Sequence, residues 1–141
     1  MTEMETPSNP VANPQQLRDT WIQRVRHLTD DVRRWCENER WFVHEGTRQV
    51  TEDEIGTYEV PTLMIQTPAG RLVFEPVARF IVGKGIRGRL DLYEFPTLRK
   101  VLILDAEEGP AWYSQDRVNL QQPWNQTGFK AIVNDLMSQA A

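Results

Sequence analysis

The chain has one cysteine, two histidines and no apolar run longer than four residues. The single cysteine, Cys36, excludes an intramolecular disulfide and every paired-cysteine zinc or redox motif. Neither His27 nor His44 lies in a spacing typical of metal ligands. A membrane-spanning helix needs about 20 apolar residues, so we expect none, and no membrane partner. The acidic, polar N-terminus lacks the features of a signal peptide, which predicts a cytoplasmic protein.

Acidic residues outnumber basic ones, 20 to 16, and the net charge is −4. This balance makes general binding to nucleic acid an unlikely function. The charge is unevenly placed, however, because residues 83–100 hold five basic and only two acidic side chains. A basic rim on an acidic body is therefore expected around this segment.

A long helix is expected over residues 14–38, after a disordered tail at 1–12. Asn13 is a suitable helix cap, and Pro14 fits the first helical position. Apolar residues recur every three or four positions on one helix face: Leu17, Trp21, Val25, Leu28, Val32 and Trp35. This stripe fits packing on the protein's own sheet. It also fits a short coiled-coil seam, so monomer and homodimer through this helix both stay open.

From Trp41 onward the apolar period changes to two, which predicts strands. The expected strands cover residues 41–44, 58–67, 71–82, 89–95 and 101–104, with a short closing strand at 111–114. Pro61 and Pro76 predict edge positions or a bulge within two of them. Short connections favour an antiparallel meander of about five strands.

A C-terminal helix is indicated by apolar residues at helical spacing: Phe129, Ile132, Val133, Leu136 and Met137. Its cap is expected near Gln122 or Thr127. The order helix, sheet, helix predicts a single α+β domain over residues 13–141, with the last helix packed on the sheet.

Residues 83–88 read Gly-Lys-Gly-Ile-Arg-Gly, a literal G-x-G-x-x-G. In a dinucleotide-binding fold the third glycine opens a helix, but residues 89–95 alternate like a strand and end at Pro96. Protein kinases place such a motif between two strands, yet the other kinase motifs are missing from this chain. Two interpretations stay open: a tight connection between strands, or an anion-binding loop. The candidate anion-binding residues are Lys84, Gly85, Arg87 and Arg89.

Three acidic residues, Glu75, Asp91 and Asp105, lie on or directly after expected strands, at a spacing that divalent-metal nucleases use. The lysine that accompanies the acids in such nucleases is absent, so the pattern is incomplete. Two or three carboxylates would still bind Mg²⁺ if they met. The alternative is that they are solvated charges, with Asp91 paired to an arginine across a hairpin.

Aromatic residues provide the last candidate site. The chain has five tryptophans, and Trp112, Tyr113 and Trp124 are candidates for a protein interface. The alternative is that most of these aromatic side chains pack in the core. No complete catalytic constellation and no cofactor motif is evident. The sequence therefore favours a non-enzymatic protein- or ligand-interaction module. The alternative is a phosphate-, nucleotide- or nucleic-acid-binding protein with metal-dependent hydrolysis.

Overall fold

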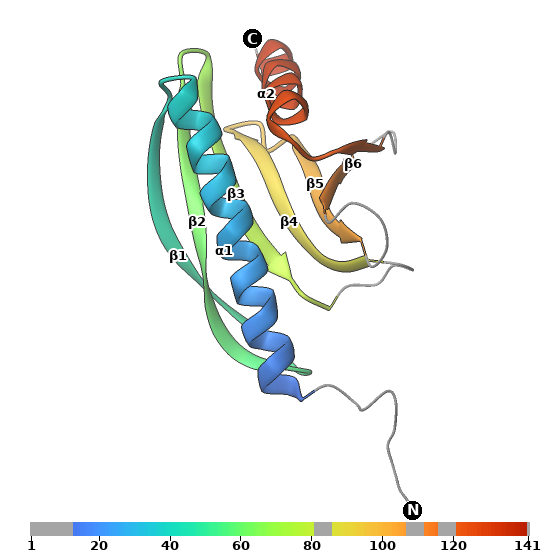
Figure 1. The fold of residues 1–141 in the computed structure, drawn as a ribbon. Coiled ribbons are helices and arrows are strands. Elements are labelled where there is room, and N and C mark those ends of the chain that lie inside the picture. The colour runs from blue at the N-terminus through green and yellow to red at the C-terminus, as the bar shows by residue number, and fades with distance from the viewer. Residues whose placement is uncertain (1–12, 81–85, 107–111, 116–120, 141) are drawn as a thin grey trace, which may run out of the picture.

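A computed structural model describes residues 13–80, 86–106, 112–115 and 121–140 (Figure 1). The expected tail at 1–12 and two glycines of the 83–88 motif lie outside these residues. The elements are α1 (Pro14–Asn38), β1 (Phe42–Glu52), β2 (Gly56–Thr67), β3 (Gly70–Ala78), β4 (Ile86–Phe95), β5 (Lys100–Ala106), β6 (Trp112–Gln115), β7 (Gln121–Pro123) and α2 (Gln126–Ala140).

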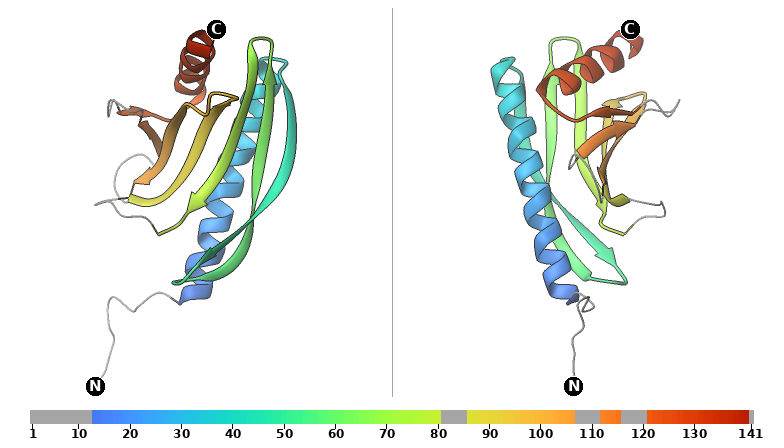
Figure 2. Two further views of the ribbon diagram at one scale, coloured as in Figure 1. Left: turned by 180° about the vertical axis from the view of Figure 1, so that it is seen from behind. Right: turned by 45° about the vertical axis from the view of Figure 1, so that its right-hand side comes forward.

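The strands form one antiparallel sheet in which β1 to β7 are neighbours in chain order. Helix α1 crosses one face of this sheet, called the inner face below, and α2 covers the end where β2 turns into β3 (Figures 1 and 2). The expected α+β meander with a helix at each end is confirmed. The expected count of about five strands is wrong, since the described residues form seven.

Two features of the sheet were not predicted, and only the first of them adds a strand. Strand β7 has only three residues, Gln121 to Pro123, and carries no apolar alternation that sequence could reveal. Strand β1 extends to Glu52 instead of ending at His44, because its far half pairs with β2 residue by residue. The pairing of β2 with β3 begins only at Leu63, so β1 and β2 continue alone as a two-stranded ribbon.

The ribbon changes which residues point inward. Tyr58 and Val60 are buried on β2, but beyond Pro61 the buried positions are Leu63 and Ile65. Two-stranded ribbons twist more strongly than wide sheets, and this twist turns the opposite face toward α1. Pro61 lies in the two-stranded part of β2, at the edge position that its missing N–H predicts.

Pro76 lies where β3 is irregular. The register between β3 and β4 shifts between Pro76 and Ala78, which confirms the expected bulge. A second shift occurs in β4, between Ile86 and Gly88, where it pairs with β5. Sequence did not predict this second bulge, which is important for the site described below.

The apolar stripe of α1 is buried against the protein's own sheet. Trp21, Val25 and Val32 are at most 1% exposed and share one core with the inner face of the sheet and with α2. A tryptophan buries about 150–250 Å², so the helix is strongly attached. Of the two interpretations of the stripe, the structure therefore has the intramolecular one. Neither described helix combines the length and apolarity needed to cross a membrane.

Both helices begin at an asparagine cap. The Asn13 side-chain oxygen accepts a hydrogen bond from the Gln15 backbone N–H at 2.7 Å, as expected. The Asn125 side-chain oxygen accepts one from the Gly128 N–H, also at 2.7 Å. The cap was expected near Gln122 or Thr127, and the structure places it between them, at Asn125.

Burial of Cys36 on α1 predicts a loss of stability at alkaline pH. The thiol is fully buried, and desolvation, with smaller effects from the charges of Glu37 and Glu39, raises its pKa to about 12. A raised folded-state pKa gives stability that is complete below the unfolded value, near 8.5, and is lost as the pH rises toward 12. Denaturant unfolding should show a loss of about 2 kcal/mol between pH 8 and pH 10.

The matched control is Cys36→Ala, in which most of that loss should disappear. The pH range ends at 10 because burial and the hydrogen bond to Glu52 raise the pKa of Tyr58, whose own effect begins above its ordinary value near 10. An unchanged pH dependence in Cys36→Ala would contradict this assignment.

Candidate functional site

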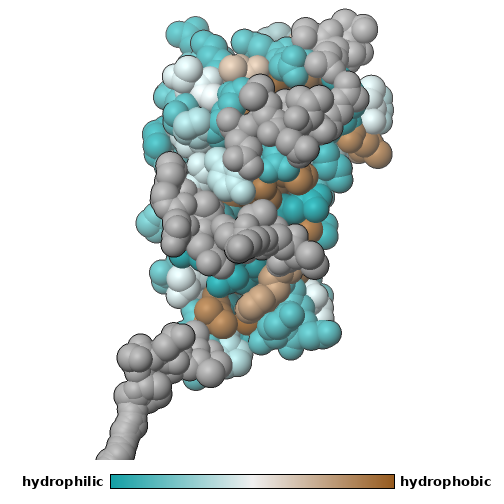
Figure 3. All heavy atoms as spheres, turned by 90° about the vertical axis from the view of Figure 1, so that its right-hand side faces the viewer, coloured by the Kyte–Doolittle hydropathy of each residue, from teal (hydrophilic) through white to brown (hydrophobic). Residues whose placement is uncertain are grey.

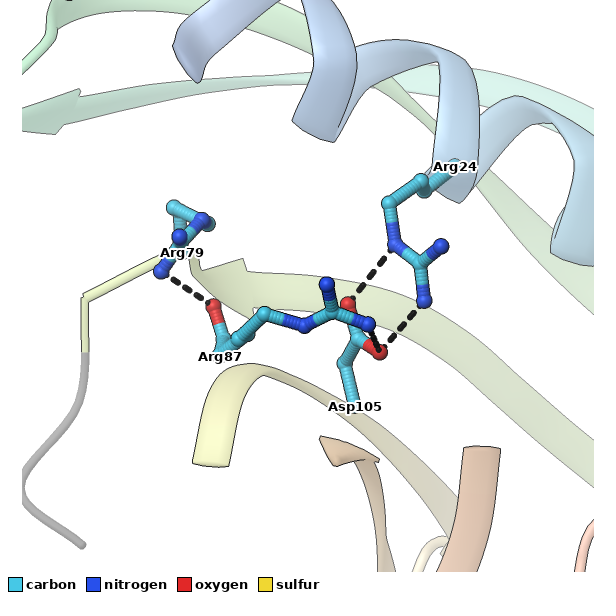
Figure 4. A network of polar contacts seen from close by, with 4 residues as sticks. All are labelled: Arg24, Arg79, Arg87 and Asp105. Carbon is cyan, nitrogen blue, oxygen red and sulfur yellow. Dashed lines mark hydrogen bonds and ion pairs between the residues drawn. The ribbon is translucent and has the colours of Figure 1, made fainter. Parts of the chain in front are cut away.

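A cavity of about 300 Å³ lies between the N-terminal half of α1 and the neighbouring ends of β3, β4 and β5. Its charged lining consists of Arg24 from α1, Arg79 just after β3, Arg87 from β4 and Asp105 from β5 (Figure 4). Neutral side chains, among them Thr20 and Trp21, complete its wall. Four separate segments of the chain thus contribute to one site.

Asp105 is the centre of the polar network. Its side chain is 1% exposed, and both of its oxygens accept hydrogen bonds from Arg24, with the Nε donor at 2.8 Å from Oδ2. Arg87 Nη2 donates to Oδ1 of the same carboxylate at 3.2 Å. Arg79 Nη1 donates to the backbone carbonyl oxygen of Arg87 at 2.8 Å (Figure 4). Two guanidinium groups are therefore held on one buried carboxylate, and the third is held on the backbone beside them.

The site has a surplus of positive charge and of donors. The described lining residues carry three positive charges and one negative. Arg24 and Arg87 offer about ten N–H donors between them, and Asp105 accepts from only some of these. Nε of Arg87 is buried and has no hydrogen-bond partner in the part of the chain described. The two side chains remain 29% and 35% exposed, so a dissolved anion can reach them.

The bulge in β4 is what turns Arg87 into the cavity. Ile86 pairs with Ala106 and Gly88 with Asp105, which leaves Arg87 without a partner in the ladder. Bulges re-aim a side chain in this way. Without the extra residue, Arg87 would alternate with Gly88 and point to the opposite face of the sheet.

Gly88 itself packs against the helix. A Cβ atom at this position would lie 2.3 Å from Cζ3 of Trp21, far below any normal contact. The missing side chain lets α1 approach β4 closely enough for Arg24, one turn beyond Trp21, to reach Asp105. The third glycine of the motif therefore has a packing role. It lies within β4, one residue before the strand expected at 89–95, and not at a helix start.

A buried carboxylate fixes the backbone that carries Arg79. Glu52 accepts hydrogen bonds from the backbone N–H groups of Arg79 at 2.9 Å and Phe80 at 2.8 Å, and from the Tyr58 hydroxyl. These contacts anchor the end of β3 to the β1–β2 ribbon. The Arg79 side chain therefore extends into the cavity from a backbone position that Glu52 fixes.

The sequence candidates for an anion site separate in the structure. Arg87 lines the cavity, whereas Arg89 lies on the other face of β4 and donates to Asp91 at 2.8 and 3.1 Å. Lys84 and Gly85 lie outside the described residues. Of the two candidates that the structure describes, one is therefore in the site. Arg24 and Arg79 were missed, because nothing in the sequence distinguishes them from the other arginines.

The three acidic candidates do not meet. Asp91 lies on the outer face and pairs with Arg89 and with Lys100 at 3.4 Å. Glu75 is its neighbour across the strand pair and lies 3.7 Å from Arg48, while Asp105 is on the inner face. Among the described residues, no group of three or more His, Cys, Asp or Glu side chains is placed to hold a metal ion.

The aromatic candidates also differ. Trp124 is 9% exposed and packs in the core against Trp35, Phe74 and Phe129, so it is not available to a partner. Tyr113 and Trp112 are half-buried. The Trp112 ring lies 6.0 Å from that of Trp21, and the Arg24 guanidinium carbon is 5.5 Å from its centroid. Of the three, Trp112 is the one beside the cavity.

Comparisons with known proteins give this chain no family. No protein-family model matches it, and no match was found among curated proteins or among solved structures. Its function is therefore inferred from the chemistry of the cavity alone.

Proposed function

We propose that the protein is a non-enzymatic binding module for a small anionic ligand held by Arg24, Arg79 and Arg87. The observation that carries the proposal is the convergence of three guanidinium groups, from three separate segments, on one cavity. Its volume of about 300 Å³ is at the lower end of the range for ligand pockets. Arginine forks match phosphate and carboxylate oxygens in geometry and charge.

Asp105 supports binding rather than catalysis. Because both carboxylate oxygens already accept hydrogen bonds from arginines, Asp105 is poorly suited to act as a base or a metal ligand. Instead it orients Arg24 and Arg87 before a ligand arrives. Such preorganisation reduces the entropy lost when a ligand orders the side chains.

The described surface offers little support for a broad protein-docking face on the side of β6. Figure 3 views this side, and the hydrophobic atoms visible there form several small groups with hydrophilic atoms between them. Docking surfaces are usually marked by contiguous apolar patches of several hundred Å². A small ligand is the better match to a small cavity with a charged lining.

Inorganic phosphate is the first probe. It replaces chloride in the buffer, so that the ionic strength stays constant. At ten times its Kd, phosphate should stabilise the protein by about 1.4 kcal/mol in thermal unfolding. Arg24→Gln should weaken phosphate binding about tenfold or more, because a charge-assisted hydrogen bond contributes about 1.5–3 kcal/mol. Isothermal titration calorimetry measures the change.

The matched control is Arg26→Gln. Arg26 is on the same helix and pairs with Glu45 at 3.1 Å, away from the cavity lining. Its replacement should leave phosphate affinity unchanged within about twofold. Absence of any phosphate effect at about 10 mM, or equal losses in both variants, would overturn the proposal.

A further inference from the structure

We infer that the preferred ligand is a planar aromatic anion, whose ring lies against Trp112 while its charged group binds the arginines. This inference rests on the proposed function and names the ligand class. It starts from a second cavity, of about 450 Å³, that lies along α1 beside Trp112. Thr20 and Arg24 line both cavities, so the two adjoin at these residues.

Arg24 is the junction of the two cavities. Its Nε and Nη2 atoms donate to Asp105 on one side, while its guanidinium carbon lies 5.5 Å from the centre of the Trp112 ring on the other. An anion bound beside this guanidinium is therefore close enough to Trp112 for a single aromatic ring to span the distance between them. The ligand's ring and its charged group need to be joined directly or by a short link.

The second cavity suits a flat apolar group. Trp112 is half-buried, with one side near Trp21 and another lining this cavity, and Leu28 adds an apolar wall. Every aromatic ligand has a π-face that can stack on an indole, and such stacking is tolerant of ring identity. The structure therefore favours a class of ligand and not one particular ring.

Charge sets the direction in which such a ligand lies. At the far end of the second cavity, Asp31 is paired with Arg34 at 2.9 Å, and His27 is exposed. The surplus of positive charge among the described lining residues is in the first cavity, around Asp105. The anionic group is thus drawn to the arginines, and the ring is left beside Trp112.

Calorimetry with three probes at constant ionic strength tests the inference. The probes are 1-naphthyl phosphate, inorganic phosphate and 1-naphthol. Naphthyl phosphate should bind about tenfold or more tightly than phosphate, because stacking adds to the ionic contacts. Trp112→Leu should remove this difference and change phosphate affinity less than threefold, whereas Arg24→Gln should weaken both phosphates. Naphthol should bind at least tenfold more weakly than naphthyl phosphate.

Two further variants keep the test decisive. Trp41→Leu replaces a half-buried tryptophan in the core near Phe129, and it should retain the advantage of naphthyl phosphate. If Trp112→Leu does not fold, Gln23→Trp serves instead. Gln23 is exposed on α1 and lines the second cavity, so a bulky ring there should fill the aromatic space and remove the advantage.

The outcomes separate the two proposals. Equal binding of naphthyl phosphate and phosphate, with both weakened by Arg24→Gln, overturns the aromatic inference and leaves the anion site intact. An advantage that survives both Trp112→Leu and Gln23→Trp also overturns it. If neither phosphate binds, the proposed function fails as well.

Discussion

Replacing Gly88 by alanine should destabilise the protein by about 3 kcal/mol, at the upper end of the cost of overpacking a core. The added Cβ would lie 2.3 and 2.4 Å from two ring carbons of Trp21. Trp21 is 1% exposed and is backed by Trp112, so the ring has little room to move away. A shift of this size is a large fraction of a typical stability of 5–15 kcal/mol, and denaturant unfolding measures it directly.

Two variants show whether the cause is contact with Trp21. Gly46→Ala places a Cβ 3.2 Å from the Thr62 hydroxyl oxygen, a tight contact but a much longer one than at Gly88. It should change stability by less than about 1 kcal/mol. In a Trp21→Leu background, Gly88→Ala should cost much less than in the wild type, because the opposing ring is gone. A Gly88→Ala protein with the wild-type unfolding midpoint would contradict the packing role.

Asp105→Asn should lower stability and at the same time tighten anion binding. Asparagine has nearly the same shape, and its amide oxygen can still accept from an arginine, so part of the orienting effect is kept. The neutral amide loses the charge-assisted hydrogen bonds with Arg24 and Arg87. Removal of the competing negative charge should outweigh the lost preorganisation. The expected loss is about 1–3 kcal/mol, less than for a fully buried pair because both arginines remain partly exposed. The positive charge of the described lining rises from two to three, so phosphate should bind several-fold more tightly.

Asp91→Asn is the matched control for this opposing pair of changes. Asp91 is also buried and also pairs with two cations, Arg89 and Lys100, but it lies on the outer face of the sheet. Its replacement should reduce stability without raising phosphate affinity. Calorimetry measures the phosphate affinity of both variants, and denaturant unfolding measures their stability. Tighter binding in both, or weaker binding in Asp105→Asn, would show that Asp105 does not compete with an anion in the cavity.

Local sequence signals were sufficient for most of the fold. The helix at 14–38 was predicted with its cap at Asn13, since helical periodicity and capping involve residues next to one another in the chain. The strand after the glycine motif was predicted from alternation alone. The far half of β1 was not, because the twist of its ribbon changes which positions are buried, and so no single alternation runs through β1 and β2.

The orientation of the arginines in the candidate site could not be predicted from short-range sequence patterns. Arg87 and Arg89 lie two residues apart with the same charge and similar neighbours in sequence, and both were candidates for an anion-binding site. Only the bulge before Gly88 sends Arg87 into the cavity, while Arg89 stays on the outer face with Asp91. A bulge is a property of the pairing between β4 and β5, so the sequence of β4 alone does not contain it.

The sequence by itself determined both helices, most of the strands, their order and the presence of a basic segment after β3, because these depend on neighbouring residues. The tertiary structure decided which charges meet. Arg24 reaches Asp105 across 81 residues of chain, and it does so because Gly88 leaves room for Trp21 to bring α1 against the sheet. Long-range packing, and not composition, therefore converts three ordinary arginines into one cavity with a surplus of positive charge.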